Sequence, residues 1–145
     1  MRGLTLLLLL AFAAACGGDE SGELSRTEYT KRANASCVKA EQTLTELGGF
    51  DNFKELEREM KIGRDALKES AEELRELQPP PKLMRDHQQL VSLTEETAAL
   101  ADRLSVAAGE NDQLEMQQQA ERADKLTILA NEVARKLGLL ECVAG

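Results

Sequence analysis

Histidine and aromatic residues are scarce in this chain. It has a single histidine, His87, no tryptophan, and 3% aromatic residues over 145 positions. Haem and di-metal sites in helical bundles need two histidines, a His–Met pair or repeated Glu-x-x-His motifs, and a nucleophilic triad needs a histidine as base. His87 stands in a polar run, which favours a place on the surface. We therefore expect no enzymatic activity, no metal site and no cofactor.

Positive charge is also in short supply. The chain carries 26 acidic and 18 basic residues, a net charge of −8. Such a surface cannot neutralise a run of phosphates, so we expect no nucleic-acid partner. Clusters such as residues 69–73 and 95–96 are expected on outward helix faces, as solvated surface and not as convergent catalytic carboxylates. With so few aromatic residues, the core must be built from aliphatic side chains.

The first sixteen residues have the layout of a secretory signal. Arg2 provides a positive start, residues 4–15 are almost entirely apolar, and small residues precede Cys16. The apolar run of about 12 residues is shorter than the ~20 needed to cross a bilayer, so a transmembrane anchor is the weaker alternative. Glycine and acidic residues follow at positions 17–22.

The stretch Ala13-Ala14-Ala15-Cys16 resembles the lipobox of bacterial prolipoproteins, with Ala13 where Leu is usual. The resemblance implies that residues 1–15 are removed as a signal peptide. It also implies that Cys16 receives a diacylglycerol and is acylated at its new amino terminus, for example with palmitate. Two or more chains would anchor the protein stably to the cell membrane, on its extracytoplasmic face. The alternative is an ordinary secretion signal whose cleavage site lies near a cysteine.

If Cys16 is lipidated, Cys37 and Cys142 remain. An even pair in an exported protein predicts a disulfide, whereas two unpaired buried thiols are disfavoured in an oxidising compartment. A catalytic redox role is disfavoured because no Cys-x-x-Cys motif is present.

Hydrophobic spacings of three and four predict four helices after a flexible tether at residues 16–24. The first begins at a Ser25 capping box and ends at Gly48-Gly49, and the second begins near Asp51 or Asn52 and stops before the proline run 79–81. The third covers about 82–108 with Gly109 as its end, and the fourth runs from an Asn111 or Asp112 cap to Gly138, with Ala120 and Ala123 on its inner face. Short connections and matched lengths predict an all-α domain over 25–145: an antiparallel up-down-up-down four-helix bundle whose apolar faces are covered from end to end.

The mature chain also resembles small actinobacterial helical lipoproteins whose activity is not established. The resemblance is carried by Glu28-Tyr29, Ala33-Asn34 and Cys37 near the start, and by Leu137-Gly138-Leu139 and Cys142 near the end. It implies the same leader, helical composition and pair of outer cysteines.

These features favour a non-enzymatic interaction module of the cell envelope that presents a helix face to an envelope protein. One such face is the regular seam of the second helix, where the small residues Gly63 and Ser70 would let a neighbouring helix approach closely. The alternative is a lipoprotein that binds a small ligand or metal between helices, around His87, Met84 and nearby acidic residues. The exposed proline loop 78–82 could also dock a partner, although ending a helix is the more common role for such a loop.

Overall fold

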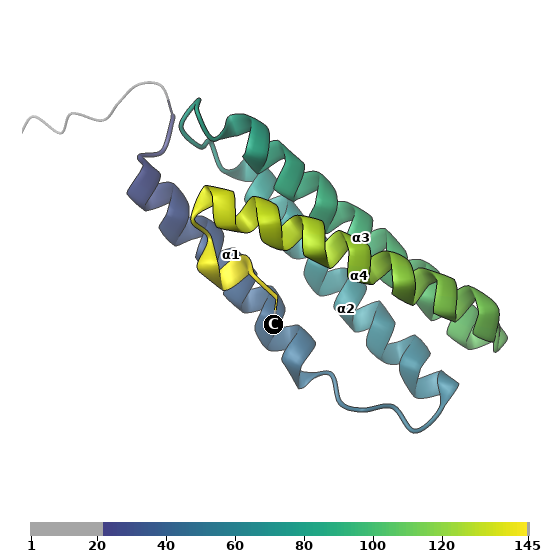
Figure 1. The fold of residues 1–145 in the computed structure, drawn as a ribbon. Helices are drawn as coiled ribbons and strands as arrows, with labels where there is room; N and C mark the ends of the chain where they lie inside the picture. The colour runs from purple at the N-terminus through teal and green to yellow at the C-terminus, as the bar shows by residue number, and fades with distance from the viewer. Residues whose placement is uncertain (1–21, 145) are drawn as a thin grey trace, which may run out of the picture.

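The structure is a computed structural model that describes residues 22–144. This part of the chain contains four α-helices, α1 (Arg26–Glu46), α2 (Phe53–Glu76), α3 (Met84–Glu110) and α4 (Gln113–Leu137), followed by a short 3-10 helix, η1 (Leu140–Cys142), and no strand. The helices lie side by side, and successive helices run in opposite directions (Figure 1). The predicted all-α, antiparallel four-helix bundle is confirmed. The predicted signal peptide and Cys16 lie outside the described residues.

Three of the four helices begin with a capped first turn, as expected. In each case the cap side chain accepts a hydrogen bond from the backbone N–H three residues later: Ser25 from Glu28, Asn52 from Glu55, and Asp112 from Glu115. These bonds satisfy amides that have no partner within the helix. The starts of these three helices are therefore determined by residues close to them in the sequence.

One helix end differs from the prediction, and another lies where it was predicted but has a different backbone geometry. Gly109 lies inside α3, and the left-handed residue that ends this helix is Asn111, with φ of 58°. Asparagine tolerates this conformation better than most residues, which is why it can replace glycine here. At the end of α1, Leu47 is extended and Gly48 and Gly49 have no positive φ, so this helix ends without a left-handed glycine. Gly138 does end α4 in the left-handed region, with φ of 78°.

The four helices differ in how extensively they pack against one another. α3 packs against both α2 and α4, and α1 packs against α2. Contacts between α1 and α4 are largely replaced by η1, which contacts both helices and lies between them (Figure 1). The expectation that every apolar face is covered from end to end by a neighbouring helix is therefore wrong for the α1–α4 side.

The well-packed core occupies the half of the bundle that holds the start of α1 and the ends of α2 and α4. We call it the packed half and define it by its buried cluster: Tyr29, Ala33, Leu74, Leu90, Val91, Leu93, Val133, Ala134, Leu137 and Leu139. Tyr29, Leu137 and Leu139 are completely shielded from solvent. The tyrosine is thus the aromatic centre of an otherwise aliphatic core.

Small residues bring α1 and α2 close together, as the seam of the second helix predicted. A Cβ atom on Gly63 would lie 3.2 Å from Leu44 and 3.3 Å from Leu47, both at the end of the first helix. Further along, the buried hydroxyls of Ser36 and Ser70 are 3.1 Å apart and form a hydrogen bond. This seam is used inside the bundle and is not a free surface.

The proline run ends α2 and turns the chain into α3, but it is not a fully exposed loop. Pro79 is buried, and the backbone N–H of Leu24 donates to the carbonyl of Gln78 at 2.8 Å. The last residues of the expected tether therefore lie against this loop.

Candidate functional site

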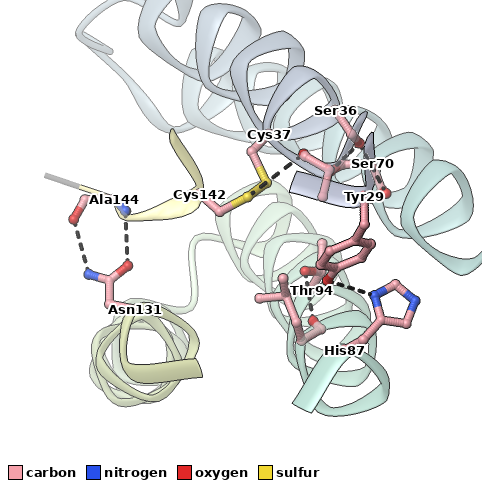
Figure 2. The surroundings of a disulfide bond; sticks show 11 residues. Tyr29, Ser36, Cys37, Ser70, His87, Thr94, Asn131, Cys142 and Ala144 are labelled. Carbon is pink, nitrogen blue, oxygen red and sulfur yellow. Dashed lines mark hydrogen bonds between the residues drawn. A yellow bond between two sulfur atoms is a disulfide. The ribbon is translucent and has the colours of Figure 1, made fainter. Parts of the chain in front are cut away.

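The C-terminal segment forms a strap between α1 and α4. Cys142, in η1, is joined to Cys37 of α1 by a disulfide with Cα atoms 5.0 Å apart. On the other side, the Asn131 side chain of α4 donates to the carbonyl of Ala144 at 3.0 Å and accepts from its N–H at 2.9 Å. Figure 2 shows both attachments on opposite sides of the same short segment. The strap, residues 139–144, is thus held to both helices that it separates.

A cavity of about 470 Å³, partly open to solvent, lies next to this strap and between the four helices. We call this part of the bundle the cavity half. Most of the wall is formed by leucine, alanine and threonine side chains, including Leu44, Leu67, Leu100, Ala101, Ala123 and Thr127. Cys37, Cys142 and Ala144 form the wall at the strap. The volume lies within the range of about 300–1,000 Å³ that is usual for small-molecule sites.

The cavity is elongated along the helix axes. Its wall on α4 runs from Gln119 to Asn131, a length of ~18 Å at a rise of ~1.5 Å per residue. The strap covers the Asn131 end, and the Gln119 end lies towards the start of α4. The shape suits a long, narrow ligand better than a compact one.

Gln119 is the buried polar residue of the cavity wall that the sequence prediction missed. Its side chain is 2% exposed, and its Nε2 donates to Glu115 Oε1 at 2.6 Å. Its Oε1 is buried and has no hydrogen-bond partner. The prediction had placed Ala120 on the inner face, but Ala120 is exposed and the neighbouring glutamine points inward. Alanine fits on either face of a helix, so its spacing did not indicate the rotation of α4.

His87 is buried, and its predicted place on the surface is wrong. It is 3% exposed and its Nδ1 lies 3.1 Å from the Tyr29 hydroxyl, with the two rings edge to face (Figure 2). Burial lowers the pKa of His87, and burial raises the pKa of Tyr29 to about 12. The spacing from Leu83 and Leu90 carried this signal, because residues four and three positions away share a helix face.

The hypothetical ligand site around His87 and Met84 is not assembled. His87 faces Tyr29 in the packed half, whereas Met84 is 36% exposed. Across residues 22–144, no group of three or more histidine, cysteine or acidic side chains is arranged to hold a metal ion. The cavity therefore replaces His87 as the candidate site.

Three carboxylates of the acidic clusters singled out in the sequence are paired with basic side chains. Lys39 of α1 donates to Glu69 at 2.7 Å and to Glu73 at 2.9 Å, and this contact lowers the pKa of the Glu73 carboxyl. Glu95 forms an ion pair with Arg75. These groups are about half exposed and lie outside the cavity wall, which agrees with their interpretation as helix surface.

No protein-family model, curated protein or solved structure matches this chain, so the functional assignment rests on the cavity itself. Within the described part of the chain, no helix is both long and apolar enough to cross a membrane.

Proposed function

We propose that the chain is a membrane-anchored extracytoplasmic lipoprotein that binds an apolar small molecule within its helical bundle, without enzymatic activity. The observation that supports this proposal is the elongated apolar cavity beside the disulfide-bonded strap. The anchor comes from the resemblance of residues 13–16 to a lipobox.

Two physical arguments favour a ligand over simple loose packing. Apolar space in a core lowers stability, and a bound apolar molecule restores the lost contacts and stabilises the folded state. The strap also closes the side on which α1 and α4 fail to meet, using a covalent bond on one side and two hydrogen bonds on the other. A closure of this kind retains a ligand while leaving the packed half undisturbed.

The direct test is native mass spectrometry of the full-length protein purified from its own membrane in mild detergent. We expect one apolar molecule per chain, removable by organic extraction, on a mature chain that begins at Cys16 and carries lipid mass. Ala123→Leu, which narrows the cavity, should reduce or abolish the bound mass. Ala120→Leu, on the exposed side of the same helix, is the matched control and should retain it.

A chain that is always bare, in wild type and control alike, would contradict ligand binding. A mature chain that begins at Cys16 without added lipid mass would contradict the anchor. The two parts of the proposal therefore fail separately.

An interaction module of the cell envelope is the second candidate function. The seam of α2 no longer supports it, because this seam packs inside the bundle. The supporting observation is now on α4, where Leu114 is 67% exposed and Ile128 is 60% exposed. These residues are two heptads apart and so lie near one side of the helix. A photo-cross-linker at position 128 should capture one reproducible envelope protein in the native membrane, and a cross-linker at the exposed position 120, which faces another side of the helix, should not. Failure to capture any reproducible protein at position 128 would remove this candidate.

A further inference from the structure

We infer that the cavity takes an uncharged, elongated amphiphile whose polar end carries a hydrogen-bond donor, such as a hydroxyl or an amide N–H, and that this donor pairs with Gln119 Oε1. The inference rests on the proposed ligand-binding function and names the chemical class of the ligand.

The buried amide of Gln119 has an oxygen acceptor without a partner. A carboxylate accepts hydrogen bonds but cannot donate them, so the 2.6 Å contact with Glu115 Oε1 assigns the NH₂ group of Gln119 to the Glu115 side. The amide oxygen is thereby left on the other side, buried and without a partner. A buried acceptor without a partner is destabilising. Gln119 belongs to the cavity wall, and a rotation of its side chain that opens Oε1 to the cavity would let a ligand donor satisfy this acceptor.

Two of the four threonines of the wall, Thr94 and Thr97, also favour a ligand that donates a hydrogen bond. The hydroxyl protons of Thr94 and Thr97 are already donated to the helix carbonyls of Leu90 and Leu93, at 2.9 and 2.8 Å. Their oxygens retain lone pairs, so both side chains act on a ligand mainly as acceptors. The polar part of the wall thus favours a ligand that donates hydrogen bonds.

The charges around the cavity argue against an anion. None of the side chains that line it, within residues 22–144, is a lysine or arginine, whereas Glu41 and Glu141 belong to the wall and are exposed. A buried carboxylate or phosphate would lack a counter-ion here and would face these acidic groups. An uncharged polar end avoids both costs.

The length of the cavity wall determines how long a ligand can be. The cavity extends ~18 Å along α4 from Gln119, between aliphatic side chains of all four helices, to the strap. An alkyl or isoprenoid chain with its polar end at Gln119 fits this shape. A compact polar metabolite would leave most of the apolar wall without contacts.

The test uses the full folded chain with Nile red as a neutral apolar reporter, displaced by three probes of similar length: tetradecanol, its methyl ether and myristate. We expect the alcohol to bind about tenfold more tightly than the ether, because only the alcohol donates a hydrogen bond. Myristate should bind more weakly than the alcohol at neutral pH. In Gln119→Leu the alcohol and the ether should bind with about equal affinity, and Nile red should still bind. In the exposed control Gln118→Leu the preference for the alcohol should persist.

Equal affinities of alcohol and ether in the wild-type protein would overturn the inference, as would an unchanged preference in Gln119→Leu. Tighter binding of myristate than of the alcohol would also overturn it. In all three cases the proposed binding function survives, because an apolar probe still binds. Failure of Nile red and every probe to bind would instead contradict the proposed function itself.

Discussion

The two halves of this bundle are built from the same four helices, yet one is densely packed and the other contains the cavity. In the packed half, Tyr29, Leu74 and Leu137 are essentially without solvent exposure. In the cavity half, the facing positions of α3 and α4 hold small residues such as Thr97 and Ala123, and the leucine at the end of α1, Leu44, is 37% exposed. The difference shows that packing depends on which side chains meet across the helices and not on the helices alone.

The disulfide lies at the boundary between the two halves. Cys37 and Cys142 belong to the cavity wall, and Leu139, at the start of the strap, is buried in the core of the packed half. The strap is therefore anchored in the stable half and extends over the half proposed to bind ligand. Its loss should affect both halves, but in different ways.

The largest expected effect comes from removing the disulfide in the double variant Cys37→Ala/Cys142→Ala. The bond closes a loop of 105 residues, for which the chain-entropy model gives ~4–5 kcal/mol of stability. We expect urea unfolding to show a loss of about 4 kcal/mol, with wild type in reductant behaving like the variant. Nile red should also exchange faster, since the strap is freed from α1. A loss below about 1 kcal/mol would show that the strap stabilises neither half.

Truncating one leucine in each half should show directly that the two halves differ in packing density. Leu137→Ala leaves a void in a fully buried site and should cost about 3 kcal/mol, whereas Leu104→Ala borders the cavity and should cost less than about 1 kcal/mol. Both losses of stability are measured by chemical denaturation, provided that the dependence of the unfolding free energy on denaturant concentration is unchanged. Similar losses for the two variants would mean that the cavity half is packed as tightly as the other.

Replacing an alanine with leucine should change the stability of the protein in opposite directions in the two halves. Ala123→Leu places methyl groups into the cavity and should raise stability by about 1 kcal/mol, while Ala134→Leu overpacks a fully buried site and should lower it by about 1–3 kcal/mol. Thermal unfolding of the ligand-free proteins compares the two. Destabilisation by both substitutions would contradict the contrast between a filled core and an available cavity.

The smallest effect is a pH dependence confined to the packed half. Burial lowers the pKa of His87 below its ordinary value of about 6.5, so between the two values the unfolded chain binds a proton that the folded chain does not. Stability is therefore complete above about pH 6.5 and should decrease as the pH falls towards 5. Because His87 is the chain's one histidine, His87→Gln should flatten this part of the profile. A slope that persists in His87→Gln would assign the effect to another group.

The sequence predicted those features that depend on neighbouring residues. The cap at Ser25, the stop before the prolines and the small residues of the α1–α2 seam are all local patterns. The caps Asn52 and Asp112 were each predicted as one of two adjacent residues. The pairing of Cys37 with Cys142 followed from cysteine number and helix order and is present in the structure.

Features that depend on the rotation of a helix or on facing side chains were missed. Gln119 lies inward because of how α4 packs on α3, and a polar residue beside alanines carries no signal for that rotation. The environment of His87 depends on Tyr29, which is 58 positions away. The cavity likewise arises from small residues on separate helices, whose juxtaposition exists only in the folded chain.

The most direct test of the central claim is a methyl-labelled NMR spectrum of the full folded protein, recorded with and without tetradecanol. We expect large, saturable shifts for methyl groups of the cavity half, such as Leu44, Leu67 and Leu100, and little change for Val133, Leu137 and Leu139. Shifts spread evenly over both halves, or confined to the packed half, would contradict the claim.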